Sequence, residues 1–274
     1  MKNNEMRHSD WIDLFPKVCQ LAEEAGQAIM RIYTQSADAD LLVAQKSDDS
    51  PLTLADLASH RLINDGLALL TPDIPVVSEE DTESHIHSKP HGCFWLIDPL
   101  DGTKEFLSRQ GEFTVNIALI EHGEPVWGVV YAPSPHQLFW GGKDFGSFRK
   151  DKSGTAQLAV SPPVQSGHLL RAVVSRSHLN QKTSDFIVQL GSVVFIRAGS
   201  SLKFCRVAEG NADIYPRLAP TCEWDTAAAQ AVIEGAGGHV YNIHGARLQY
   251  GKADVLNPGF IAASVPFAQL NLGR

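Results

Sequence analysis

Trp95-Leu-Ile-Asp-Pro-Leu-Asp-Gly-Thr-Lys-Glu-Phe106 is the stretch of the chain that decides the fold. Its apolar start predicts a buried strand that breaks at Pro99, and Gly102-Thr103 predicts the start of a helix, whose first N–H groups would face an anion. Asp98 and Asp101 flank the turn between the two elements. Because magnesium prefers carboxylate and carbonyl oxygens, one short loop carries candidate metal ligands beside a candidate phosphate site.

The same loop has a purely structural alternative. Asp101-Gly102 is a common turn pair, and Asp98 and Thr103 could cap the following helix. A phosphatase loop of the Asp-x-Asp type, whose first aspartate is a nucleophile, does not fit, because two residues separate Asp98 from Asp101. The loop alone leaves the choice between a site and a turn open.

Other segments also place a carboxylate at the start or end of a predicted element. They are Ser50-Pro-Leu-Thr-Leu-Ala-Asp56, Val77-Ser-Glu-Glu80 and Trp224-Asp-Thr-Ala-Ala228. Asp56 and Asp225 lie near predicted helix starts, where capping is the structural alternative, and Glu79 follows a short apolar run. If these carboxylates gather in one place, they repel one another strongly unless a cation lies between them.

Hydrophobic periodicity predicts the elements that carry these residues. Apolar positions recur at helical spacing over residues 14–33 and 57–70, which predicts two amphipathic helices. Short apolar runs predict strands, of which the third and fourth read as a hairpin in an antiparallel sheet. These runs are residues 75–77, 94–97, 113–120, 126–131 and 138–140.

After the polar stretch 150–163, shorter elements alternate, which indicates a change of architecture. We expect a boundary near residue 160, with residues 1–160 forming an α+β domain around a large antiparallel sheet and residues 161–274 a smaller α/β domain. The candidate site would lie where the two domains meet. Gly141–Gly146 lacks the spacing of a phosphate-binding P-loop and is expected to form hairpin turns.

Together these segments resemble the inositol monophosphatase superfamily of lithium-sensitive, magnesium-dependent phosphatases, which share the patterns W-x-x-D-P-L/I-D-G-T and W-D-x-A/T-A. The resemblance extends from the first helix to Asn257-Pro-Gly259. It implies an α/β fold, a layered αβαβα sandwich of the inositol monophosphatase/fructose-1,6-bisphosphatase type. It also implies two or three magnesium ions in each site.

The resemblance further implies roles for individual residues. Thr103 and Asp56 would orient the attacking water, Glu79 would join them in catalysis, and Asp98 would bridge the metals. Such a site hydrolyses a phosphate ester by in-line displacement without a covalent enzyme intermediate. The implied metal ligands are Glu79, Asp98, the backbone carbonyl of Leu100, Asp101 and Asp225.

Within the superfamily, Gly111–Ala118, Gly199–Cys205 and Tyr215–Arg217 resemble the bacterial nucleotidase branch. That branch removes the 3'-phosphate of adenosine 3',5'-bisphosphate to give AMP, and the expectation extends to the 5'-phosphosulfate relative of this substrate. The structural alternative makes Ser200 a helix cap, and Lys203 and Arg217 solvated surface charges. The implied substrate contacts are Gly102, Thr103, His178, Ser200, Lys203, Arg217 and Asp225.

Composition excludes several other classes of function. A chain of 274 residues with 43% hydrophobic content can bury a substantial core. The net charge of -8 argues against a nucleic-acid polymer as partner, so an anionic substrate would need bound cations. The four cysteines are scattered and predict neither a disulfide framework nor a zinc site, and His85, His87 and His91 lie in a polar segment that does not favour a transition metal.

No apolar run is long enough to span a bilayer, and residues 1–11 lack the apolar core of a signal peptide. We therefore expect a cytoplasmic protein, and the resemblance extends this to peripheral attachment at the inner membrane. The expected partner is a small nucleotide bisphosphate, and the expected assembly is a monomer or a weak homodimer. The rival functions are an inositol or sugar monophosphatase, and a catalytically silent regulator that binds metal or nucleotide.

Overall fold

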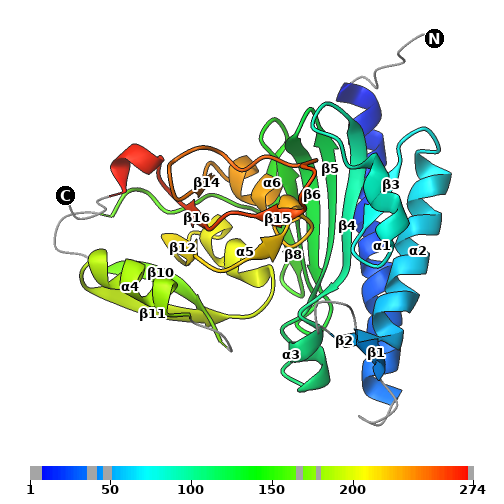
Figure 1. Ribbon diagram of the computed structural model, residues 1–274, viewed down its shortest axis with the longest axis horizontal. Coiled ribbons are helices and arrows are strands. Elements are labelled where there is room, and N and C mark those ends of the chain that lie inside the picture. The colour runs from blue at the N-terminus through cyan, green and yellow to red at the C-terminus, as the bar shows by residue number, and fades with distance from the viewer. Residues whose placement is uncertain (1–7, 36–41, 46–50, 165–168, 177–179, 271–274) are drawn as a thin grey trace.

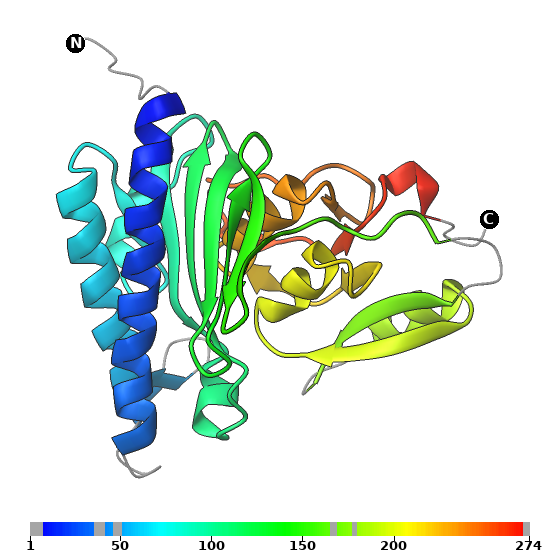
Figure 2. The same ribbon diagram turned by 180° about the vertical axis from the view of Figure 1, so that it is seen from behind.

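The computed structural model of the protein describes residues 8–35, 42–45, 51–164, 169–176 and 180–270. Its elements stack as alternating layers of helix, sheet, helix, sheet and helix (Figures 1 and 2). The predicted layered αβαβα sandwich is confirmed. Among the described residues, no helix is long and apolar enough to cross a membrane.

The outer helical layer consists of α1 (His8–Gln35) and α2 (Leu54–Leu70), which pack against each other and cover one face of the large sheet. Leucine, valine and alanine side chains along one stripe of α1 are fully or nearly fully buried there. Helix α2 begins with a capping box, in which Thr53 and Asp56 each bond the other's backbone. This cap fixes the Asp56 carboxylate at the start of α2.

The large sheet has the strand order β3-β4-β5-β6-β7-β8-β9. All neighbours are antiparallel except β3, which runs parallel to β4, so the predicted antiparallel sheet is correct apart from that edge. The prediction missed β8 and β9. The strands of the large sheet are β3 (Val76–Ser78), β4 (Cys93–Asp101), β5 (Thr114–Glu121), β6 (Glu124–Ala132), β7 (Gln137–Gly142), β8 (Gly146–Asp151) and β9 (Gly154–Gln157). The predicted hairpin turn within Gly141–Gly146 is present: residues 143–145 connect the end of β7 to the start of β8.

The sequence predicted that strand β4 breaks at Pro99. In the structure the strand instead continues to Asp101 through a bulge. Asp98 pairs with Asn116 and Asp101 with Thr114, so three steps along β4 oppose two steps along β5. Side chains three residues apart on a regular strand point to opposite faces. The extra residue in the bulge cancels this offset and brings both aspartates to one face of the sheet.

The small sheet has the strand order β11-β10-β12-β16-β14, with α5 and α6 between it and the large sheet and α4 on its far side. Its strands are β10 (Leu170–Ser175), β11 (Val193–Ala198), β12 (Ile214–Arg217), β14 (His239–Asn242) and β16 (Phe260–Ala263). The helices are α4 (Gln181–Gln189), α5 (Leu202–Ala208) and α6 (Ala227–Gly235). The remaining elements are β1 (Leu42–Gln45), β2 (Pro51–Thr53), η2 (Thr82–His87), α3 (Thr103–Leu107), β13 (Thr221–Cys222), β15 (Leu256–Asn257) and η3 (Phe267–Gln269).

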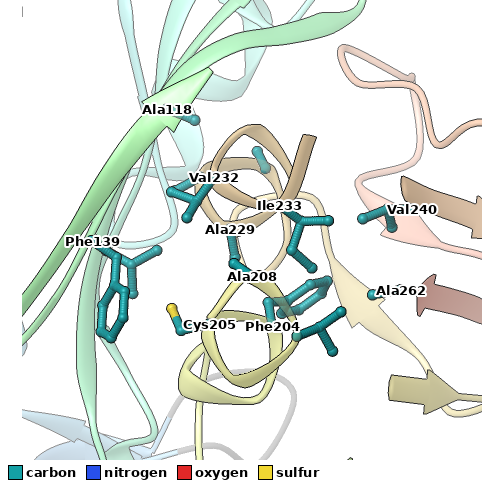
Figure 3. Close-up of a cluster of buried hydrophobic side chains, with 14 of the residues drawn as sticks. Ala118, Phe139, Phe204, Cys205, Ala208, Ala229, Val232, Ile233, Val240 and Ala262 are labelled. Atoms are coloured by element: carbon teal, nitrogen blue, oxygen red, sulfur yellow. The ribbon is translucent and has the colours of Figure 1, made fainter. Parts of the chain in front are cut away.

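One buried hydrophobic cluster joins the two sheets through the helices between them. Figure 3 shows Phe139 of the large sheet on one side of Cys205 and Val232 of the middle helices, and Ala262 of the small sheet on the other side. The predicted boundary near residue 160 lies between β9 and β10, but the core crosses it. Because apolar side chains of both parts are buried together, the parts are held in a fixed relation. The division into domains at residue 160 stays a prediction.

Candidate active site

Three carboxylates meet where the two parts of the chain face each other. Asp98 and Asp101 come from β4, and Asp225 comes from the turn that precedes α6. Each offers one oxygen, and these oxygens all lie within 4.8 Å of one another. Hard oxygen donors at such spacing fit a divalent cation of the magnesium class. Among the described residues, the histidines form no comparable group.

Asp225 is held by the turn and not used as a helix cap. Its Oδ2 accepts a hydrogen bond of 2.7 Å from the backbone N–H of Cys222, whereas Thr226 is the N-cap residue of α6. Burial raises the pKa of Asp225 well above its usual value, and the nearby Asp101 and Glu79 carboxylates raise it further. A bound cation would relieve this repulsion, so the donor set fits the metal that the sequence implied.

Glu79 follows the end of β3, and its carboxylate is close enough to Asp225 to raise the pKa of that residue, but it is not one of the three grouped carboxylates. The backbone N–H of Glu79 donates to the carbonyl of Ile97 at 3.2 Å. Because Ile97 directly precedes Asp98, this bond holds the Glu79 backbone close to Asp98. Asp98 in turn accepts a hydrogen bond of 3.1 Å from the backbone N–H of Leu100. The structure therefore brings three of the predicted ligand side chains together, Asp98, Asp101 and Asp225, and places Glu79 near them.

Asp101 is oriented by hydroxyl groups from the other part of the chain. Ser200 Oγ and Ser201 Oγ donate to its Oδ2 at 2.5 and 3.0 Å, while Thr114 bonds Ser200 at 2.5 Å. Asn116 donates to Ser201 at 3.0 Å. The structural alternative of Ser200 as a helix cap is wrong, because Ser201 is the N-cap residue of α5 and neither hydroxyl caps it.

Sequence reasoning missed Ser201, Thr114 and Asn116. A usable signal was present, because Thr114 and Asn116 are polar residues two positions apart in a strand that is otherwise apolar up to Ile120. Both are buried, and buried polar groups need partners. The face of β5 that carries Thr114 and Asn116 therefore needed polar partners, which the structure shows to be Ser200 and Ser201.

Asp56 and Thr103 form a second group beside the carboxylates. Asp56 Oδ2 accepts hydrogen bonds from the N–H and hydroxyl of Thr53 at 2.8 and 2.5 Å, which is the capping alternative that the sequence allowed. The other oxygen, Oδ1, accepts from Thr103 Oγ1 at 3.4 Å, and Thr103 Oγ1 also lies 3.3 Å from the carbonyl of Leu100. Asp56 therefore caps α2 with one oxygen and presents the other to Thr103.

The turn before Thr103 requires glycine. Gly102 has a φ of 93°, and a Cβ there would lie 3.3 Å from the carbonyl oxygen of Glu112 and 3.4 Å from Ser200 Cβ. Helix α3 begins at Thr103, as predicted, but ends at Leu107. The alternative in which Asp98 and Thr103 cap this helix is wrong, because Gly102 is its N-cap residue and no side chain caps it.

The cations predicted to contact substrate line the same cavity as the carboxylates. Asp101, Lys203, Arg217 and Asp225 share a cavity of about 80 Å³ with Tyr215, whose ring centroid lies 5.8 Å from Lys203 Nζ. Lys203 is only 8% exposed, and burial lowers its pKa. It is therefore not the solvated surface charge of the structural alternative.

Arg217 is half-buried at this cavity, and its buried Nε has no hydrogen-bond partner among the described residues. A buried cationic donor without a partner is costly and favours an anion beside it. His178, the remaining predicted substrate contact, lies outside the described residues.

Comparison with known proteins gives consistent similarities. A model of the inositol monophosphatase family matches residues 13–271. The 3'(2'),5'-bisphosphate nucleotidase CysQ of Escherichia coli K12 is 47% identical over 252 residues, which cover 90% of this chain and 98% of that protein. CysQ of Buchnera aphidicola is 40% identical over 265 residues, covering 93% and 95% of the two chains.

Solved structures share the same architecture. CysQ from Bacteroides thetaiotaomicron, a bacterial member of the inositol monophosphatase family, superposes with a TM-score of 0.77 at 38% identity and covers 91% of this chain and 96% of its own. The Thermotoga maritima IMPase gives a TM-score of 0.75 at 21% identity, covering 95% and 96%. This second likeness supports the fold alone.

Proposed function

The chain belongs to the inositol monophosphatase family, a family of metal-dependent phosphatases, and we propose that it hydrolyses the 3'-phosphate of adenosine 3',5'-bisphosphate to give AMP and phosphate. The observation that carries this proposal is one cavity with two ends. Asp101 and Asp225 line this cavity together with Lys203 and Arg217, and Asp98 lies beside the two carboxylates. We call the three carboxylates its acidic end and the two cations its basic end. A bisphosphate hydrolase needs metal-binding carboxylates at the phosphate that is cleaved and cationic side chains at the phosphate that is retained.

At the acidic end, Glu79, Asp98, Asp101, Asp225 and the carbonyl of Leu100 would hold magnesium. Magnesium there supplies neutralisation of the phosphate oxygens and a lowered pKa for water. The closeness of the three carboxylates and the raised pKa of Asp225 support this assignment.

Thr103 and Asp56 would position the attacking water. Because the Thr103 hydroxyl donates to Asp56 Oδ1, its oxygen lone pairs can accept a hydrogen from the water and align it with the phosphorus. The proton then passes toward Asp56, a water O–P bond forms, and the bond from phosphorus to the ribose 3'-oxygen breaks. The leaving oxygen takes a proton from solvent, so that AMP and phosphate result.

At the basic end, Lys203 and Arg217 would bind the 5'-phosphate, which is not cleaved. The buried Lys203 ammonium and the unpartnered Arg217 Nε support this role. Ser200, Gly102 and Asp225 would line the path between the phosphates, with His178 near the nucleoside. A 5'-phosphosulfate presents a similar anion at this end and would also be accepted.

The test is a phosphate-release panel at fixed magnesium with adenosine 3',5'-bisphosphate, inositol 1-phosphate and fructose 1,6-bisphosphate. We expect the highest kcat/KM for the nucleotide, loss of activity on chelation, and poor replacement by calcium, which accepts a larger and less regular oxygen shell. A preference for inositol 1-phosphate would instead support the monophosphatase rival. Magnesium binding without release from any substrate would support the silent regulator.

A further inference from the structure

His85 contacts Ser78 and Trp224, the residues directly before Glu79 and Asp225, but is not itself one of the candidate metal ligands. It lies on η2, the turn of 3-10 helix that folds back over the end of β3. Its Nε2 lies 2.9 Å from the carbonyl oxygen of Ser78, and its ring centroid lies 5.2 Å from that of Trp224 at an interplanar angle of 40°. Ser78 directly precedes Glu79, and Trp224 directly precedes Asp225.

The hydrogen bond from His85 is one of several that hold Ser78 in place. The Ser78 N–H donates to Ser84 Oγ at 3.1 Å, and its own Oγ accepts from the Glu80 N–H at 3.2 Å and lies 2.8 Å from His60 Nδ1. The carbonyl accepts hydrogen bonds from the Asp81 N–H at 3.3 Å and from His85, whose Nε2 must carry the hydrogen because a carbonyl can only accept. The backbone on the amino side of Glu79 is therefore fixed.

The contact on the Trp224 side lies across the chain, in the part that supplies Asp225. Trp224 is 7% exposed and belongs to the core cluster that joins the two sheets. Asp225 follows it in a turn closed by the Cys222 N–H. A shift of the Trp224 ring would therefore move the backbone that carries Asp225.

We propose that His85 is a positioning residue that holds the Glu79 and Asp225 sides of the carboxylate group at one separation, and so sets its affinity for a divalent cation. This rests on the proposed metal site. The side chain acts through Ser78 and Trp224 and does not bind the metal itself. Partners behind the ligands of a metal site orient them in this way, and their loss typically weakens metal binding by about 10–100-fold.

The test compares His85→Ala and His85→Phe with His87→Ala, a control on the same turn whose side chain is exposed. Manganese binding to the substrate-free protein is measured by titration calorimetry, and phosphate release is measured as a function of magnesium. We expect His85→Ala to raise the manganese Kd and the half-saturating magnesium concentration by about tenfold or more. His85→Phe, which keeps the ring against Trp224, should show a smaller rise.

At saturating magnesium, kcat and the KM for the nucleotide should stay near wild type in all three variants, which general damage would not allow. Unchanged manganese affinity in both His85 variants, or an equal loss in His87→Ala, would overturn the proposal. If the wild-type protein binds manganese but hydrolyses none of the substrates, and His85→Ala still weakens binding, the proposed function fails while the role of His85 stands. If the protein hydrolyses the nucleotide and the His85 variants bind metal as wild type does, the proposed function stands while the role of His85 fails.

Discussion

The two ends of the cavity differ in how the chain builds them. The acidic end takes Asp98 and Asp101 from the large sheet and Asp225 from residues 161–274. The hydroxyl groups of Ser200 and Ser201 donate to Asp101 and orient its carboxylate. The basic end takes Lys203 from α5 and Arg217 from β12, both within residues 161–274. The acidic end therefore depends on how the two parts meet, whereas the basic end is local to one of them. Damage at the acidic end should affect every substrate, and damage at the basic end should affect only bisphosphates.

The largest effect is expected at the acidic end. Asp98→Asn replaces a carboxylate that lies beside both Asp101 and Asp225, so metal binding and hydrolysis should fail together. We expect kcat/KM to fall by more than the roughly 10²–10⁴ typical of lost acid–base catalysis, and equally for all substrates. Phosphate release and manganese titration measure this. A variant within about tenfold of wild type would remove Asp98 from the metal site.

A somewhat smaller loss is expected where the water is positioned. Asp56→Asn or Thr103→Ala should lower kcat by about 10²–10⁴ for every substrate and leave manganese binding nearly intact. Thr53→Ala is the matched control, because the Thr53 hydroxyl bonds Asp56 Oδ2, whereas Thr103 bonds the other oxygen, Oδ1. It should reduce stability by about 0.5–2 kcal/mol in denaturant unfolding and keep most of the rate. Near-normal turnover in both Asp56→Asn and Thr103→Ala would contradict the assignment.

Selective damage is expected at the basic end. A charge-assisted contact is worth about 1.5–3 kcal/mol, so Lys203→Ala or Arg217→Ala should reduce kcat/KM for adenosine 3',5'-bisphosphate by about 10–100-fold. Adenosine 3'-monophosphate lacks the contacted phosphate and should be much less affected. Equal losses on both substrates would mean that the two ends are not separate.

The basic end should also respond to pH. Burial lowers the pKa of Lys203, so its ammonium loses its proton below the usual lysine range as pH rises. The KM for the bisphosphate should then rise by a few fold on the alkaline side, at pH values below the ordinary lysine pKa of about 10.4. Lys203→Arg stays charged there and should abolish the rise, and adenosine 3'-monophosphate should not show it. A rise that persists in Lys203→Arg would assign it to another group.

The smallest effect is expected at the rim between the parts. Arg176 pairs with Glu112 through bonds of 2.9 and 2.8 Å, but its side chain is 46% exposed. Exposed pairs contribute little, so Arg176→Ala should change the free energy of unfolding by no more than about 1 kcal/mol. Denaturant unfolding checks this. A larger loss would mean that this pair, and not the shared core, holds the parts together.

The sequence singled out the candidate carboxylates because each lies in a short segment whose chemistry is local. It could not predict that Asp98 and Asp101 share a face, because this depends on a bulge against β5 at Pro99, where the pattern suggested a break. Strand β9 was missed for a related reason. Its residues are all exposed and carry no apolar alternation.

Contacts between distant segments were the least predictable part of the site. Ser201 reaches Asp101, and His85 reaches Trp224, only because the two sheets face each other across α5 and α6. Neither pairing leaves a periodic pattern in the sequence. Resemblance supplied the roles of Lys203 and Arg217, and the structure adds that both line the cavity of the carboxylates.

The most direct test of the two-ended cavity is the identity of the product. Adenosine 3',5'-bisphosphate is incubated with the protein and magnesium in heavy-oxygen water, the 5'- and 3'-monophosphate isomers are separated by chromatography, and the nucleotide and phosphate are analysed by mass spectrometry. We expect unlabelled AMP and singly labelled inorganic phosphate, because water attacks the 3'-phosphorus at the acidic end while the basic end retains the 5'-phosphate. Release of adenosine 3'-monophosphate, or of adenosine with no AMP intermediate, would contradict this assignment of the two ends.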